Sequence, residues 1–148
     1  DLWLPALMSP RPFMPTESRV LEDFEGAWHI DRHIVPAVGS AAMFEGQGIW
    51  TPCAEGLIYH EKGVIRLPDQ PAMQAERRYI WRHDLTVQFD DGRLFHTVPA
   101  LGGPVQHQCD PDHYEGDYDF SDWPQFVVRW HVIGPRKDYR MTSRFQRA

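Results

Sequence analysis

The feature that most constrains this chain is the alternation of apolar and polar residues in short runs from Gly26 onward. Turn residues interrupt the runs roughly every 8–12 positions. At 126–132, for example, Phe, Val, Trp and Val occupy every second position. Side chains of a strand alternate between two faces, whereas a helix needs apolar residues three or four apart. That helical spacing is not sustained anywhere after residue 40, so the pattern predicts an all-β fold.

Ten strands are expected, at residues 26–35, 40–51, 56–67, 75–83, 85–89, 93–97, 105–109, 114–120, 125–133 and 137–147. Asp91-Gly92 predicts a tight hairpin, because this pair readily adopts the positive φ angles of a primed turn. Gly134-Pro135 predicts a second turn. A meander of this many short strands removes its edges by closing, so we expect one antiparallel up-and-down β-barrel, preceded by a short helical turn.

Length and local composition divide the chain into two parts. The 148 residues suit one domain, which we place at residues 17–148. Residues 1–16 contain Pro5, Pro10, Pro12 and Pro15, a density that opposes both helix and sheet, so they are expected to form an extended arm. The apolar stretch at 2–8 is short and lacks a basic leader, and we interpret it as part of that arm rather than as a signal peptide.

Charge and cysteine content limit the partners. The net charge is −6, and the sequence has no extended basic patch, which argues against binding nucleic acid or an anionic membrane. It also has no apolar run of about 18 residues. Two cysteines, Cys53 and Cys109, form no disulfide framework; a bridge between them stays open, but two reduced thiols in a cytoplasmic protein are favoured. The oligomeric state is left open.

A first resemblance concerns the start of the barrel. Gly26-Ala27-Trp28 is similar to the Gly-x-Trp signature of calycins, the lipocalin-like barrels. The resemblance implies that Trp28 plugs one end of the barrel under an arginine from the last strand, and Arg144, then Arg140, are the candidates. Alternation along that strand offers the opposite interpretation, in which Tyr139, Met141 and Phe145 face inward and both arginines face solvent.

A second resemblance covers nearly the whole chain from residue 21. The chain resembles an uncharacterised bacterial and fungal family, domain of unknown function 6314. The matching motifs are Phe24-x-Gly26-x-Trp28, Tyr59-x-Glu61-x-Gly63, Arg77-Arg78-Tyr79-Ile80-Trp81, Asp91-Gly92-x-x-Phe95-His96, His107-x-Cys109-x-x-Asp112-x-Tyr114 and Gly134-Pro135-x-Lys137-Asp138-Tyr139. This resemblance supports the fold and leaves the function open.

Alternation also predicts which polar groups share the barrel interior. The candidate ligand-binding residues are Tyr59, Glu61, Arg77, Tyr79, Trp81, His96, His107, Cys109, Tyr114 and Trp130. A buried charge needs a partner, and Glu61 and Arg77 lie on neighbouring predicted strands, so they are expected to pair. These groups form either the polar end of an aromatic pocket or an ion pair that only closes the barrel.

The leading functional hypothesis is a barrel that binds a small apolar or aromatic molecule. The alternative is a small cofactor-free enzyme with Glu61 and His107 as general acid and base. A third possibility is an interaction module with an apolar outer patch. We expect no cofactor and no metal: His107, Cys109 and Asp112 have strand spacing, but nothing places His113 or His60 beside them to complete a zinc site, and no haem motif occurs.

Overall fold

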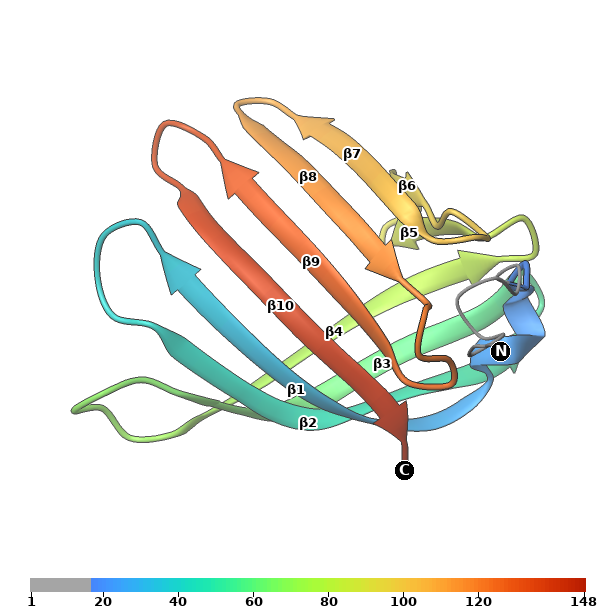
Figure 1. Ribbon diagram of the computed structural model, residues 1–148, viewed down its shortest axis with the longest axis horizontal. Helices are drawn as coiled ribbons and strands as arrows, with labels where there is room; N and C mark the ends of the chain where they lie inside the picture. Colours follow the sequence, from blue (N-terminus) through green and yellow to red (C-terminus); the bar gives the residue numbers. More distant parts are fainter. Residues whose placement is uncertain (1–16) are drawn as a thin grey trace, which may run out of the picture.

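The structure, a computed structural model, describes residues 17–148 (Figure 1). A short 3-10 helix, η2 (Leu21–Phe24), precedes ten strands that curve around one interior. The strands are β1 (Gly26–Pro36), β2 (Ala42–Cys53), β3 (Gly56–Arg66), β4 (Met73–Arg82), β5 (Thr86–Phe89), β6 (Leu94–Thr97), β7 (Gly103–Cys109), β8 (Asp112–Asp119), β9 (Phe126–Ile133) and β10 (Asp138–Arg147).

The predicted all-β architecture is confirmed. Each of the ten predicted strands is present, with ends no more than two residues from those expected, and the short helical turn lies directly before Gly26. The arm predicted at residues 1–16 lies outside the described residues, so the proposed domain boundary stays a prediction. Within residues 17–148, no helix has the length and apolar character needed to cross a membrane.

The sheet is a meander that almost closes. Its strand order is β6-β5-β4-β3-β2-β1-β10-β9-β8-β7, with antiparallel pairing between neighbours. The first and last strands pair over nearly their full length, from Trp28 opposite Arg147 to Pro36 opposite Tyr139. The two ends of the order, β6 and β7, are consecutive in the chain but share no ladder of hydrogen bonds. The barrel therefore has one seam, between β6 and β7.

Aromatic side chains pack across this seam. The ring of Phe95 on β6 lies 5.3 Å from the His107 ring on β7 and 5.2 Å from the Trp130 ring on β9, measured between centroids. Phe89 on β5 stacks on Phe95 at 4.8 Å. Packing of rings, rather than backbone pairing, holds the last gap of the barrel together.

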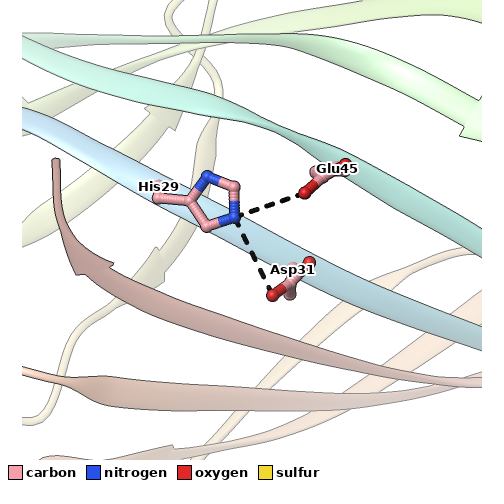
Figure 2. A group of neighbouring side chains, drawn as sticks. All are labelled: His29, Asp31 and Glu45. Atoms are coloured by element: carbon pink, nitrogen blue, oxygen red, sulfur yellow. Dashed lines mark ion pairs between the residues drawn. The ribbon is translucent and has the colours of Figure 1, made fainter.

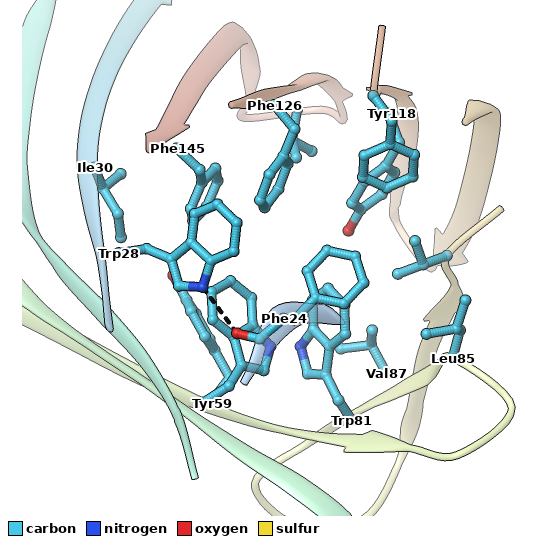
Figure 3. Close-up of a cluster of buried hydrophobic side chains, with 14 of the residues drawn as sticks. Phe24, Trp28, Ile30, Tyr59, Trp81, Leu85, Val87, Tyr118, Phe126 and Phe145 are labelled. Carbon is cyan, nitrogen blue, oxygen red and sulfur yellow. Dashed lines mark hydrogen bonds between the residues drawn. The ribbon is translucent and has the colours of Figure 1, made fainter. Parts of the chain in front are cut away.

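One end of the barrel, around η2, is tightly filled with aromatic side chains. Phe24 is fully buried, and its ring lies 5.1–5.7 Å from those of Trp50, Trp81, Trp123 and Phe126. Figure 3 shows Trp28 beside it, with the indole Nε1 donating a 2.8 Å hydrogen bond to the carbonyl oxygen of Phe24. This bond satisfies a buried donor and fixes η2 as a stopper in the barrel end.

The predicted arginine over Trp28 exists, but it is neither Arg144 nor Arg140. The guanidinium carbon of Arg147 lies 4.1 Å from the Trp28 ring centroid, and its two terminal nitrogens donate 2.6 Å bonds to the carbonyl oxygens of Asp23 and Glu25. Arg147 is the residue opposite Trp28 in the ladder, whereas Arg144 and Arg140 are exposed on the outer face. Alternation along β10 explains the correction, because positions 140 and 144 have the outward parity.

We predict that Arg147→Ala lowers the free energy of unfolding by about 1–3 kcal/mol, since the variant loses a cation–π contact and two bonds to backbone carbonyls. Urea unfolding followed by far-ultraviolet circular dichroism measures the change. Arg144→Ala, on the outward face of the same strand, is the matched control and should change stability by no more than about 0.5 kcal/mol. Equal losses in the two variants would contradict the role assigned to Arg147.

Candidate functional site

A cavity of about 260 Å³ occupies the barrel interior. One part of its wall is aromatic and aliphatic, and another part is polar. The lining residues are Arg32, Trp50, Tyr59, Glu61, Arg77, Tyr79, Trp81, Val87, Phe89, Phe95, His96, Tyr114, Tyr118, Phe126, Val128, Trp130, Val132, Tyr139, Met141, Ser143 and Phe145. Gly116 makes room for one of these rings: a Cβ there would lie 2.7 Å from the indole of Trp130.

The buried carboxylate of Glu61 organises the polar wall. Arg32 donates to both of its oxygens, at 2.7 and 2.8 Å, and the Tyr59 hydroxyl donates to Oε1 at 2.6 Å. The Nε atom of Arg77 lies 3.3 Å from Oε2. Arg32 is itself anchored, because its Nε donates to the Ser143 hydroxyl at 2.6 Å. Four strands thus contribute to one cluster, in which the Glu61 carboxylate is fully paired.

The cluster fixes the protonation states of its members. Burial alone would raise the pKa of Glu61, but the hydrogen bonds and charge of Arg32, with contributions from Arg77 and Tyr59, outweigh burial and hold this pKa below its ordinary value. Burial and the neighbouring Glu61 charge raise the pKa of Tyr59 well above its ordinary value. Glu61 is therefore an anion and Tyr59 a neutral donor at physiological pH.

The structure brings most of the predicted candidate residues to the cavity. Those that line it are Tyr59, Glu61, Arg77, Tyr79, Trp81, His96, Tyr114 and Trp130. The expected contact of Glu61 with Arg77 is present, but Arg32 is the closer partner and was not anticipated. The signal was available, because Arg32 has the same strand parity as Trp28 and Ile30 and must face inward with them.

Two predicted residues, His107 and Cys109, do not line the cavity. His107 lies on β7 at the seam, behind Phe89, Phe95 and Tyr114, whose ring centroids are 5.3–5.9 Å from its own. Its Nε2 atom is buried without a hydrogen-bond partner in the described part of the chain. Cys109 pairs with Asp112 at the β7–β8 turn. Because β7 is an edge of the sheet, its inward residues fill the seam instead of the interior.

His96 forms a separate buried pair with Tyr118. Its Nε2 lies 2.7 Å from the Tyr118 hydroxyl, and its Nδ1 has no partner among residues 17–148. Burial, with a smaller effect of His107, lowers the pKa of His96 to about 3. Burial likewise raises the pKa of Tyr118. Both side chains are neutral near pH 7, so this part of the wall adds hydrogen-bonding atoms but no charge.

A possible metal-ligating group lies elsewhere, on the outer face of β1 and β2 (Figure 2). The Nε2 atom of His29 is 3.8 Å from an Asp31 oxygen and 3.6 Å from a Glu45 oxygen. The three side chains are 35%, 52% and 64% exposed, and no fourth His, Cys, Asp or Glu within residues 17–148 completes the group. A solvated ion-pair cluster accounts for this geometry.

The chain is similar to one protein family and to solved β-barrel structures. A family model described as a family of unknown function, DUF6314, matches residues 24–147. Among solved structures, the S-type phycobiliprotein lyase CPES from Guillardia theta has a TM-score of 0.58 at 12% identity, covering 95% of this chain and 93% of that one. The redesigned β-barrel mFAP0, bound to DFHBI, has a TM-score of 0.43 at 14% identity, covering 84% and 99%. No curated protein matches the chain.

We predict that Glu61→Gln destabilises the protein by about 3–5 kcal/mol, because it leaves the buried guanidinium group of Arg32 without its counter-charge. The double variant Glu61→Leu with Arg32→Met removes the buried pair together and should be markedly more stable than Glu61→Gln. Urea unfolding at pH 7 compares the variants. A Glu61→Gln variant within about 0.5 kcal/mol of the wild type would contradict this account of the cluster.

The low pKa of His96 predicts that the free energy of unfolding depends on pH. Its pKa is about 3 in the folded state and 6.5 in an unfolded chain, so the unfolded state binds the extra proton between these values. The free energy of unfolding should therefore fall as the pH drops below 6.5, by on the order of 1 kcal/mol per pH unit from this residue. His96→Gln should show a shallower decline between pH 7 and pH 5, whereas His83→Gln, at an exposed histidine, should follow the wild type.

Proposed function

The chain belongs to the DUF6314 family, a family of unknown function, and we propose that its barrel binds a small, largely apolar or aromatic molecule. The observation that carries the proposal is the interior cavity of about 260 Å³, bounded by aromatic rings and by a prearranged polar cluster. Protein interiors are normally packed with few voids larger than a water molecule, and a cavity lowers stability. A cavity of this size and lining is typical of a small-molecule site.

Two indole groups of the cavity wall carry unpaired hydrogen-bond donors. The Nε1 atoms of Trp50 and Trp81 are buried, and neither has an acceptor among the described residues. Both indoles line the cavity. An indole nitrogen can only donate, and a buried donor left unpaired costs about 1–3 kcal/mol. Because these nitrogens expose almost no surface, a ligand would reach them only after a shift of the indole rings.

The enzymatic alternative has less support. General base catalysis by Glu61 needs a carboxylate that can accept a proton near neutral pH, yet two arginines hold the pKa of Glu61 low. Its proposed partner His107 lies behind the cavity wall. The geometry of Glu61 suits a fixed anchor for Arg32 and Tyr59, and so favours binding over acid–base chemistry.

The setting we propose follows from charge and cysteines. Cys53 and Cys109 are both free and partly buried, which suits a reducing compartment, and we propose a cytoplasmic location. With a net charge of −6, we propose no nucleic-acid or anionic-membrane partner.

We predict that Val128→Phe abolishes binding of a neutral aromatic probe, because Val128 lines the cavity and a larger side chain would occupy its space. The measurement is the fluorescence of N-phenyl-1-naphthylamine, which rises in an apolar site. Val127→Phe is the matched control, since Val127 is the next residue of β9, faces the other side of the strand and does not line this cavity. Circular dichroism verifies that both variants are folded.

Two outcomes would contradict the proposal. If the wild type takes up neither this probe nor any apolar, carbonyl-bearing or aromatic metabolite in a thermal-shift screen, the cavity is a packing defect and the proposal is wrong. Retention of full probe binding by the Val128→Phe variant would place the probe elsewhere on the protein and would count against the cavity as the site.

A further inference from the structure

We infer that the ligand of this cavity is an anion: an aromatic or apolar molecule whose carboxylate, or a group of similar charge and shape, is bound by Arg77. The inference rests on the proposed function and names the chemical class of molecule that the site takes. Three observations carry it, namely the charge of the lining, the unused donors of Arg77 and the tyrosine hydroxyls around it.

The charged groups of the lining do not balance. The cavity wall contains two arginines, Arg32 and Arg77, and one acidic residue, Glu61. Arg32 and Glu61 face each other through two parallel hydrogen bonds and neutralise one another. The positive charge of Arg77 is left over, and His96, neutral near pH 7, adds none. A bound anion would cancel this excess, and a bound cation would add to it.

Arg77 also has hydrogen-bonding capacity to spare. A guanidinium group carries five N–H donors in a planar fork. The Nε atom of Arg77 lies near Glu61, and Nη1 donates a long 3.3 Å bond to the Tyr79 hydroxyl. The hydrogen bonds of the described residues leave its Nη2 atom without a protein acceptor. The side chain is 43% exposed, so a solute can reach it.

Tyrosine side chains accompany this arginine. Tyr79, Tyr114 and Tyr139 line the cavity with Arg77. Burial, then the neighbouring Tyr114, raises the pKa of Tyr139, so its hydroxyl keeps its proton and can donate. Tyr139 is the second residue of β10, whereas Arg147 at the plugged end finishes it, so Tyr139 lies away from the stopper. A carboxylate here would meet a charged fork and hydroxyl donors, while its apolar body extends toward the aromatic wall.

The rest of the cavity matches an acceptor-bearing ligand. Nη2 of Arg77 is a donor that has no acceptor among the described residues. The carboxylate of Glu61 offers no comparable opening for a cationic ligand, because its oxygens already receive bonds from Arg32 and Tyr59. The accessible unused donor of the site is thus that of Arg77, whereas its one acidic group is already occupied.

Three probes of one shape test the inference: 2-naphthoate, 2-naphthamide and 2-naphthylmethylamine, with charges of minus one, zero and plus one. Isothermal titration calorimetry with the full chain measures the three affinities. The acid should bind most tightly, the amide less tightly and the amine least. Arg77→Gln should weaken 2-naphthoate binding by about tenfold or more and change 2-naphthamide binding little. Arg78→Gln, the adjacent exposed position on β4, removes the same charge from the outer face and should leave both affinities unchanged.

The outcomes separate the two proposals. If the amide binds as well as the acid, and Arg77→Gln weakens both equally or neither, the anionic class is wrong while the binding function stands. If none of the three probes binds the wild type, the binding function fails for ligands of this kind, and the inference fails with it. If Arg78→Gln weakens the acid as much as Arg77→Gln, the effect is one of overall charge and the role of Arg77 is refuted.

Discussion

Pairing of the first strand with the last is the constraint on which the rest of this molecule depends. The β1–β10 ladder places Arg147 over Trp28 at one point and brings Arg32 beside Ser143 further along. The first contact anchors the stopper, and the second begins the polar cluster in the cavity. A single long-range backbone pairing, between segments more than 100 residues apart, thus builds both the closed end and the candidate site.

The interior combines two arrangements that usually oppose each other. Around Phe24 the rings interlock at centroid distances of 5.1–5.7 Å, which stabilises the fold by burying apolar surface. Further along the barrel, a buried ion pair and a cavity replace that packing, and each costs stability that a hydrophobic core would not. The aromatic end offsets these costs, so the polar wall can be kept rigid around open space.

Much of the fold could be predicted because strand parity is a local property. The runs from Gly26 to Arg147 indicate their own period, and parity alone placed Glu61, Tyr59 and Trp130 inside. Parity would also have placed Arg32 inside, with Trp28 and Ile30, but it was not applied to the first strand. Register is different: parity excludes Arg144, but which inward-facing residue of β10 lies over Trp28 depends on how β10 slides along β1, which no local pattern records. The position of His107 depends on the seam, which arises only after the whole sheet has closed.

The seam gives the barrel an unusual mechanical property. In a barrel with hydrogen bonds between every pair of neighbouring strands, the number and stagger of the strands fix the circumference. Here β6 and β7 are not hydrogen-bonded to each other. The two edge strands of the sheet, its margins, meet through side chains such as Phe95 and His107. Spreading those margins breaks ring contacts and the hydrogen bond between His96 and Tyr118, but no backbone bonds between strands. The circumference of the barrel therefore depends on the side-chain contacts between β6 and β7, which yield more easily than a ladder of backbone hydrogen bonds.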